Sequence, residues 1–325
     1  MIDGQEIQIL GVERGFPVCW CAKAEQYLGI ILAWSHWASL ANLLFNASFM
    51  RNTSWLNEIK AFWRLLWQLG CRDVQMRYKG SVLGLLWSLI TPIMTVALYT
   101  FLFSGIFHAQ WGEDFGSARA AGESPAHGQY ALILFTGLML HTFLAEIMQR
   151  SGVVITQQAN LVKKVVFPLH VLPAVVVFAS VFQMLVSLLV LLLGLVVSGQ
   201  SVHASWVALP LLILPFVVLG LGVSWVLAAL GVFLRDLNQL MGWLIMALLF
   251  SAPVLYPLKT VSQKMGAWLY LNPLTYMVEE WRQVIYAGTW PHWQQWGVYL
   301  LVSVLMAVLG YSVFGKMKKG FADVL

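Results

Sequence analysis

The chain has 325 residues, of which 60% are hydrophobic, 14% aromatic and only 10% charged, and its formal net charge is +5. A soluble protein of this length cannot bury so many apolar side chains in one core, so the composition excludes an ordinary soluble domain. Charge-free stretches exceed the roughly 20 residues that cross hydrocarbon as a helix, and the alternating strands of a membrane barrel are absent. We therefore predict an all-α integral membrane protein.

The first 50 residues differ from the rest of the chain. Residues 27–49 are long enough to cross a membrane, but Ser, Asn and His recur among them, so their insertion is only marginally favourable. The composition changes at Met50, where a segment with capping residues leads into an amphipathic helix. We interpret residues 1–50 as an atypical N-terminal extension and residues 51–325 as the membrane domain. We also expect Met50 to be the natural start, so that residues 1–49 are not translated, which mass spectrometry of the native N-terminus would test.

A short amphipathic helix is predicted at residues 58–72. One of its faces is apolar and partly aromatic, with side chains at helical spacing: Ile59, Phe62, Trp63 and Leu66. Another face is basic or polar at steps of four: Lys60, Arg64, Gln68 and Arg72. Such a helix is typical of the cytoplasmic membrane surface. A positively charged anchor that only sets the topology explains the same pattern.

Six transmembrane helices are predicted after this helix. The charge-free stretch 165–234 is too long for one crossing, and the polar segment SGQSVHAS at 198–205 divides it into two. The predicted spans are residues 82–107, 129–150, 171–197, 206–232, 239–256 and 294–314.

The basic residues between these spans predict their orientation. One side of the predicted membrane receives thirteen of them: Arg51, Lys60, Arg64, Arg72, Arg77, Lys79, Arg150, Lys163, Lys164, Arg235, Lys316, Lys318 and Lys319. The other side receives four: Arg119, Lys259, Lys264 and Arg282. By the positive-inside rule the richer side is the cytoplasm, so both ends of the membrane domain are cytoplasmic.

Recognised catalytic chemistry is absent from the sequence. The chain has no G-x-x-x-x-G-K-[ST] phosphate loop, no H-E-x-x-H and no G-x-S-x-G, and its three cysteines support neither a disulfide framework nor a metal site. Glu146, with His141, is the main ionisable group inside a predicted span. We interpret it as a carboxylate satisfied near the interface rather than a proton relay. We therefore predict that the chain is not an enzyme, holds no metal, and takes its energy from another polypeptide.

Five motifs resemble those of a known family, the permease subunits of type-2 ABC exporters for polysaccharides such as O-antigen, capsule and teichoic acid. The resemblance runs from about residue 58 to the C-terminus. The motifs are RDVQMRYKGSVLGLLWSLITPI (72–93), NLVKKVVFPLHVLP (160–173), FLRDLNQL (233–240), LNPLTYMVEEWRQVIYAG (271–288) and FADVL (321–325). It implies six spans, an N-terminal interface helix, a coupling helix between spans two and three, and re-entrant helices before the last span.

The same resemblance implies a function. A homodimer of the chain, with two separate ATPase subunits, would export a polysaccharide linked to polyprenyl pyrophosphate across the inner membrane. No cofactor is expected on this chain, because ATP and Mg²⁺ would bind to the partner ATPase. Two alternatives remain at this point: a type-2 ABC exporter of a lipid or drug, and a membrane-embedded transferase that modifies glycans.

Four groups of candidate site residues follow. The candidate pyrophosphate-binding residues are the cations Arg72, Arg77 and Lys79, which are predicted to lie at the cytoplasmic surface. The positive-inside rule alone would also explain basic residues at this position. Aromatic side chains at steps of four on span one could line a glycan channel: Tyr99, Phe103 and Phe107. The resemblance implies ATPase coupling by Asn160, Leu161, Lys163, Lys164, Phe167, Arg235 and Asp236. It implies an extracellular gate containing Asn272, Pro273, Glu279, Glu280 and Arg282.

Overall fold

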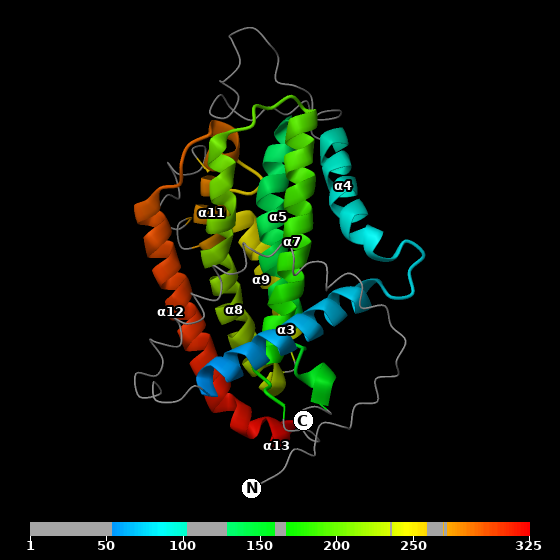
Figure 1. Cartoon of the computed structure of the whole chain (residues 1–325), viewed down its shortest axis with the longest axis vertical. Helices are drawn as coiled ribbons and strands as arrows, with labels where there is room; N and C mark the ends of the chain where they lie inside the picture. Colours follow the sequence, from blue (N-terminus) through cyan, green and yellow to red (C-terminus); the bar gives the residue numbers. More distant parts are fainter. Residues whose placement is uncertain (1–53, 103–128, 160–166, 235, 259–268, 270–271) are drawn as a thin grey trace. The chain divides into compact units, whose positions relative to one another are not determined.

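The computed structural model describes residues 54–102, 129–159, 167–234, 236–258, 269 and 272–325, and every regular element in these ranges is helical (Figure 1). This confirms the all-α prediction. The long helices are α3 Ser54–Tyr78, α4 Trp87–Tyr99, α5 Gln129–Ser151, α7 Val171–Val197, α8 Leu209–Phe233, α9 Leu237–Ser251, α11 Pro273–Arg282 and α12 Trp293–Met317. Short turns are η2 Gly84–Leu86, η5 Thr156–Gln158, η6 Ala204–Ala208, the π-helical η7 Gln283–Ala287, η8 Lys318–Gly320 and α13 Phe321–Val324.

The chain divides into two units, residues 1–61 and 62–325. Of the first unit, the structure describes only the opening turns of α3. The expected N-terminal extension, the apolar segment 27–49 and the proposed start at Met50 lie outside the described residues. The second unit contains the helical bundle and is described below.

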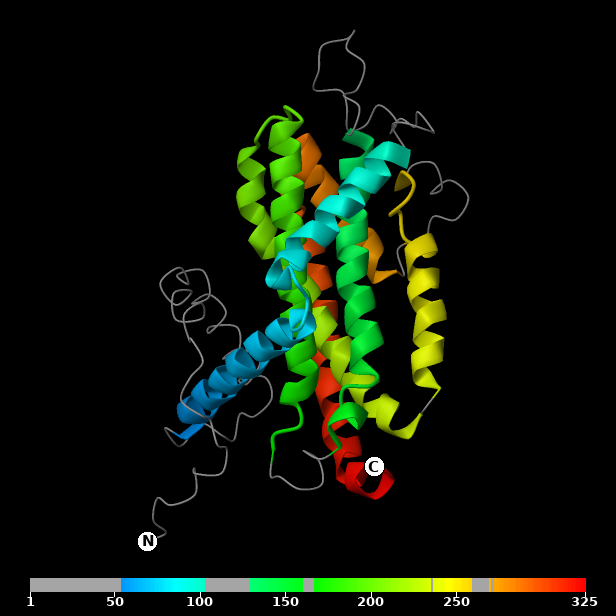
Figure 2. The same ribbon diagram turned by 90° about the vertical axis from the view of Figure 1, so that its right-hand side faces the viewer.

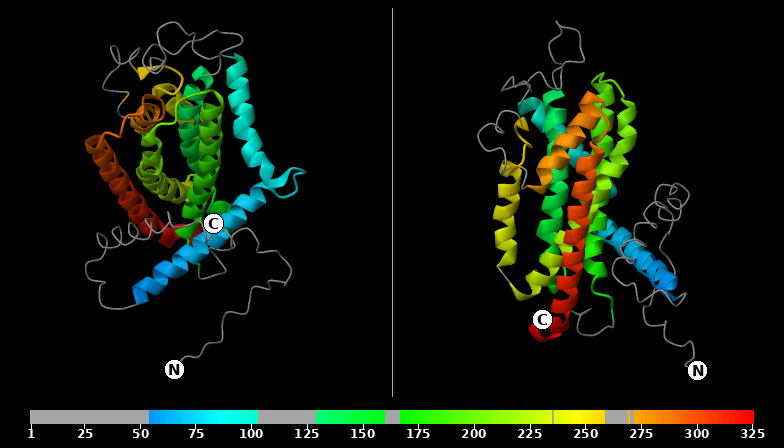
Figure 3. Two further views of the ribbon diagram at one scale, coloured as in Figure 1. Left: turned by 45° about the horizontal axis from the view of Figure 1, so that its top comes forward. Right: turned by 90° about the vertical axis from the view of Figure 1, so that its left-hand side faces the viewer.

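Helices α5, α7 and α8 form the centre of the bundle. Most residues in the most apolar stretch of α5 are buried inside the bundle, and the same holds for α8. Helix α12 runs alongside α8 (Figure 3), and the two backbones touch because glycines meet at the crossing. A Cβ at Gly310 would lie only 2.3 Å from the carbonyl oxygen of Gly222. The glycines therefore permit a close approach that side chains would prevent.

Helices α4 and α9 lie at the outside of the bundle (Figure 2). Helix α4 contacts α5 and α7, and α9 contacts α5. Both leave large apolar side chains exposed: Ile93, Met94, Leu98, Trp243, Leu244, Met246 and Phe250. In water such faces would be unstable, so they require lipid or another protein surface.

Among the residues that the structure describes, five helical segments are long and apolar enough to cross a membrane: Gly84–Leu102, Tyr130–Ser151, Val171–Val197, Ala204–Phe233 and Trp293–Val324. The remaining predicted span, 239–256, is shorter than expected. Its helix α9 has 15 residues and ends at Ser251. Ala252 adopts an extended conformation (φ −99°, ψ 151°) because the following Pro253 disfavours a helical conformation in the residue before it.

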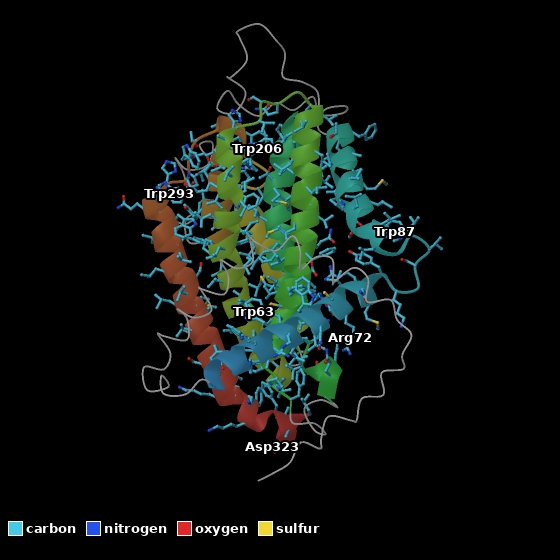
Figure 4. All side chains as sticks on the ribbon, viewed as in Figure 1. Trp63, Arg72, Trp87, Trp206, Trp293 and Asp323 are labelled. Atoms are coloured by element: carbon cyan, nitrogen blue, oxygen red, sulfur yellow. The ribbon has the colours of Figure 1, made fainter. Side chains whose placement is uncertain are left out.

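The ends of the helices gather at two opposite ends of the bundle. The C-termini of α5, α8 and α12 lie at its lower end in Figure 1, together with the N-termini of α7 and α9. Trp206 and Trp293 lie toward the upper end, whereas Trp63 and Asp323 lie in the lower half (Figure 4). Arg150, like Lys316 at the end of α12 and Lys318 and Lys319 after it, belongs to the lower end, which the positive-inside rule predicts to be cytoplasmic.

From Phe62 onward, helix α3 packs along α7. The ring of Phe62 stacks on His170 at 5.6 Å, and Leu66 packs against the first turns of α7. Gly70 faces Phe178, whose ring leaves no room for a Cβ. The apolar face predicted to meet the membrane surface therefore meets protein here. Tyr78, the last residue of α3, reaches Gln183, which lies twelve residues or about 18 Å along α7.

Candidate functional site

The loop that joins α3 to α4, residues Lys79–Leu86, combines charge with exposed apolar surface. Gly80 and Gly84 have φ values of +90° and +52°, a region that other L-residues rarely adopt, so glycine permits this path. Between and after them the apolar side chains of Val82, Leu83, Leu85 and Leu86 are exposed, Val82 completely. Arg72 on α3 and Trp87 at the start of α4 flank the loop (Figure 4).

A charge quartet links the last turns of α3 to the end of α5. It consists of Asp73, Arg77, Glu146 and Arg150. Arg77 donates to Glu146 Oε1. Arg150 Nη2 donates to both oxygens of Asp73, at 2.9 and 2.7 Å, and its Nη1 lies 3.3 Å from Glu146 Oε1. Two arginines and two carboxylates neutralise one another, which reduces the cost of holding charge at the flank of an apolar bundle.

Two of the three predicted phosphate ligands are exposed cations. Arg72 and Lys79 form no ion pair with any residue that the structure describes. Arg77 differs, because Glu146 already neutralises it. Its side chain is nevertheless 27% exposed, and Arg77 makes one hydrogen bond within the described residues. A guanidinium carries five N–H donors, so Arg77 retains donors for an anion.

An amide of α7 holds both ends of the loop. The Tyr78 hydroxyl donates to Gln183 Oε1 at 3.0 Å, and Gln183 Nε2 donates to the carbonyl oxygen of Ser88 at 3.1 Å. Tyr78 is the last residue of α3 and Ser88 is in the first turn of α4. The loop is therefore fastened at its two ends to the same side chain.

The residues predicted to form an extracellular gate belong to a buried polar scaffold around α11. Arg282 is completely buried and donates to the carbonyl oxygens of Pro253 and Val254, the latter at 2.7 Å. Burial lowers the pKa of Arg282 to about 10, so the guanidinium remains charged at neutral pH. Glu280 is also buried, and its Oε1 lies 2.7 Å from His292 Nδ1.

Asn272 and Pro273 fix the start of α11. Asn272 caps the helix, accepting a hydrogen bond from the Leu274 N–H at 2.9 Å, and its Nδ2 donates to Leu248 and Ser251 of α9. The carbonyl oxygen of Pro273 accepts a hydrogen bond from the Tyr299 hydroxyl of α12 at 3.0 Å. Glu279 lies on the same helix. The structure thus places these residues between α5, α9 and α12, and whether they gate a channel stays a prediction.

The predicted coupling and channel residues are described only in part. Asn160, Leu161, Lys163, Lys164 and Arg235 lie outside the described residues, as do Phe103 and Phe107. Phe167 packs against the apolar cluster at the lower end of the bundle, and Asp236 is exposed just before α9. Tyr99 is half-buried at the end of α4. The stripe of three aromatic side chains therefore remains a prediction.

Sequence reasoning missed Gln183 and the carboxylate partners of the quartet as members of this site. A signal for the quartet was present, because Asp73 and Arg77, like Glu146 and Arg150, are four residues apart and share a helix face. The interpretation of Glu146 as a satisfied carboxylate agrees with its two arginine partners. His141, its neighbour in α5, lies with Nε2 3.0 Å from the carbonyl oxygen of Ile245.

Fold and site together define a multi-pass membrane protein of helical bundle type. The sequence model of the ABC-2 type transporter family matches residues 64–286, more than half of the chain, so the chain belongs to this family. Two proteins of Klebsiella pneumoniae, both named O-antigen export system permease protein RfbA, are 29% and 27% identical to the chain over 255 residues. These residues are 78% of this chain and 92% of each relative.

A protein of the same name from Myxococcus xanthus is 27% identical over 271 residues, which are 82% of this chain and 98% of that protein. Nearly the whole length of each relative is therefore aligned. The family match and these relatives confirm the resemblance to ABC-2 type permeases that the sequence motifs indicated.

Proposed function

We propose that the chain is the membrane permease of an exporter that moves a polysaccharide linked to polyprenyl pyrophosphate across the inner membrane. It acts as a homodimer with two separate ATPase subunits, which bind ATP and Mg²⁺. The observation that carries this proposal is the function in the names of the relatives: each is named an O-antigen export system permease protein, and each aligns over 92% or more of its length.

The loop between α3 and α4 supports a substrate with a charged head and an apolar tail. Exposed cations at Arg72 and Lys79 suit a pyrophosphate, since charge-assisted hydrogen bonds to phosphate are strong. The exposed apolar side chains of Val82 and Leu83 suit a polyprenyl chain in the adjacent lipid. Arg77 is the third ligand, through the donors that Glu146 leaves free.

The exposed apolar faces of α4 and α9 support a homodimer. They carry large side chains such as Met94, Trp243 and Phe250, and the rest of the bundle does not cover them. A second copy could cover one or both faces and enclose a channel, with Tyr99 and the neighbouring aromatic side chains on its wall. Glycans bind weakly to such aromatic faces, as passage requires.

The lower end supports docking of the ATPase. Phe167 and Asp236, two of the predicted coupling residues, lie at the end of the bundle that the basic residues predict to be cytoplasmic. Transport energy must enter from a partner there, because the sequence has no phosphate-binding loop. The α11 region, with Glu280 and Arg282, lies at the opposite end, where the proposal places the outer gate.

The alternative of a glycan-modifying transferase is disfavoured by two contacts. Its best candidate acid and base were Glu146 and His141. Glu146 is held by two arginines, and His141 lies within hydrogen-bonding distance of a backbone carbonyl group. An ABC-2 exporter of a lipid or drug shares the family, so only the substrate separates it from the proposal.

Deletion of the gene tests the substrate. The expected result is loss of surface polysaccharide together with accumulation of lipid-linked polymer inside the cell, restored by the wild-type gene. Loss of surface polysaccharide without accumulation would instead support an enzyme of glycan synthesis. Normal surface polysaccharide with altered lipid or drug export would support the alternative exporter.

A further inference from the structure

We propose that Gln183 is a positioning residue: it holds the end of α3 and the loop between α3 and α4, so that Arg77 and Lys79, on either side of Tyr78, face the substrate headgroup from a fixed position. The inference rests on the proposed function for the identity of the substrate. Its first test does not, because it measures the loop itself.

Gln183 stands out among the polar side chains of α7. The 27-residue helix is otherwise strongly apolar, and its two serines bond to the backbone of their own helix, Ser180 to Val176 and Ser187 to Gln183. Gln183 lies near the middle of the helix and is half-buried. A polar amide at this level is costly unless its hydrogen bonds are satisfied, so its partners are expected to be specific.

Donor and acceptor chemistry allows only one orientation of the amide. The Ser88 carbonyl group can only accept, so the amide NH₂ group must face it. The amide oxygen then faces Tyr78, whose hydroxyl can donate. Each half of the amide thus has one partner, and the two partners lie at opposite ends of the loop.

The contact of Gln183 with Tyr78 restrains the positions of two of the three cations, Arg77 and Lys79. Tyr78 lies between Arg77 and Lys79 in the chain, so fixing its side chain fixes the backbone that carries both. The quartet holds the adjacent turn of α3 through Asp73 and Arg77, but it does not reach α4. Among the described residues, the two bonds of Gln183 therefore link the loop to α7 at both of its ends.

Inside the loop, the hydrogen bonds are local and join residues three positions apart. They run from the Ser81 hydroxyl to Tyr78 O at 2.8 Å, from Ser81 N to Tyr78 O at 3.3 Å, from Gly84 N to Ser81 O at 3.3 Å and from Leu86 N to Leu83 O at 3.1 Å. Two glycines at positive φ add backbone freedom. Without an external tether, a loop of this kind would sample many positions, and Lys79 would have to be ordered when the substrate binds.

Hydrogen–deuterium exchange of the purified chain in lipid nanodiscs tests whether the bonds of Gln183 to Tyr78 and Ser88, called the tether below, restrain the loop. In Gln183→Leu, which removes both bonds, amides of the loop should exchange about tenfold faster, the effect expected of two interhelical hydrogen bonds in a membrane protein. Tyr78→Phe removes one of the two bonds, so the loop amides should exchange about threefold faster than in the wild type. Ser187→Ala is the matched control, because its hydroxyl bonds only to its own helix, and the loop should exchange as in the wild type.

The second readout uses the complete exporter with its ATPase. For Gln183→Leu we expect the apparent KM for lipid-linked glycan in stimulated ATP hydrolysis to rise about fivefold, with basal and maximal rates unchanged. A merely structural role would lower the rates or the folded yield instead. Unchanged loop exchange in a folded Gln183→Leu protein would overturn the inference, and so would faster exchange with an unchanged KM.

The two proposals fail in different ways. If lipid-linked glycan does not stimulate even the wild-type complex, the proposed function is wrong, and loop exchange alone decides whether Gln183 is the tether. If the glycan stimulates the wild type and Gln183→Leu matches it in both measurements, only the tether is wrong.

Discussion

The charge quartet makes a prediction that can be worked out from its geometry. Arg77 and Glu146 have side chains 27% and 17% exposed, between the surface and the interior. Exposed ion pairs contribute up to about 1 kcal/mol, whereas removing one partner of a buried pair costs about 3–5 kcal/mol. We therefore expect Arg77→Gln and Glu146→Gln each to destabilise the bundle by about 2 kcal/mol, or about 6 °C in melting temperature.

A double-mutant cycle measured by thermal melting of the purified protein checks this value. The double variant should melt close to Glu146→Gln, because both changes remove the Arg77–Glu146 pair and only Glu146→Gln also removes the contact with Arg150, and the coupling energy should be about 1.5 kcal/mol or more. Arg64→Gln is the control: Arg64 is an exposed basic residue on α3, away from the quartet, and should change stability by about 0.5 kcal/mol or less. Additive effects of the two quartet changes would refute the reasoning.

Three further predictions concern close packing, pH and the cations. Gly231→Ala should sharply reduce the folded yield, because a Cβ there would lie 1.8 Å from a neighbouring carbonyl oxygen, whereas Gly242→Ala, with nothing within 4 Å, should fold normally in size-exclusion assays. Burial, followed by the charge of a nearby lysine, lowers the pKa of His170, so the unfolded chain binds more protons below about pH 6.5 and acidification should lower the melting temperature of wild type more than that of His170→Phe. The double change of Arg72 and Lys79 to Gln should raise the apparent KM for lipid-linked glycan about tenfold or more without lowering the melting temperature, since neither residue forms an ion pair with the described residues; a melting temperature that falls with KM would indicate a structural role.

The positions of the longer spans could be predicted from the sequence because hydropathy and length decide them. Residues 171–197 were predicted and are observed as α7, and the prediction 129–150 differs from α5 by one residue. The predicted span 239–256 is too long, although Pro253 was a readable sign that the helix ends before it.

The contacts of the candidate site could be predicted only in part. The basic residues before span one pointed to the correct segment, but the sequence alone does not show which of them is neutralised. Within the described part of the chain Arg77 is paired and Lys79 is not, because only Arg77 follows Asp73 by one helical turn and so faces α5. The partnership of Tyr78 with Gln183 joins residues 105 positions apart, which helical periodicity within one segment cannot reveal.

The burial of α11 illustrates the same limit. Glu280 and Arg282 in an apolar, aromatic segment indicated a polar, re-entrant region. Both side chains are buried in the bundle, where Arg282 donates to backbone carbonyl groups and Glu280 contacts His292. Sequence pattern predicted that these charges need partners, and tertiary structure decided which partners they have.

The most direct test of the account is translocation in proteoliposomes that contain the chain, its ATPase and a polyprenyl-pyrophosphate-linked glycan. The proposed export function predicts ATP-dependent appearance of the glycan on the side opposite the ATPase. Omission of either protein should abolish this appearance, and the double change Arg72→Gln and Lys79→Gln should reduce it. Glycan that stays on the ATPase side while ATP is hydrolysed, or that crosses equally well without this chain, would contradict it.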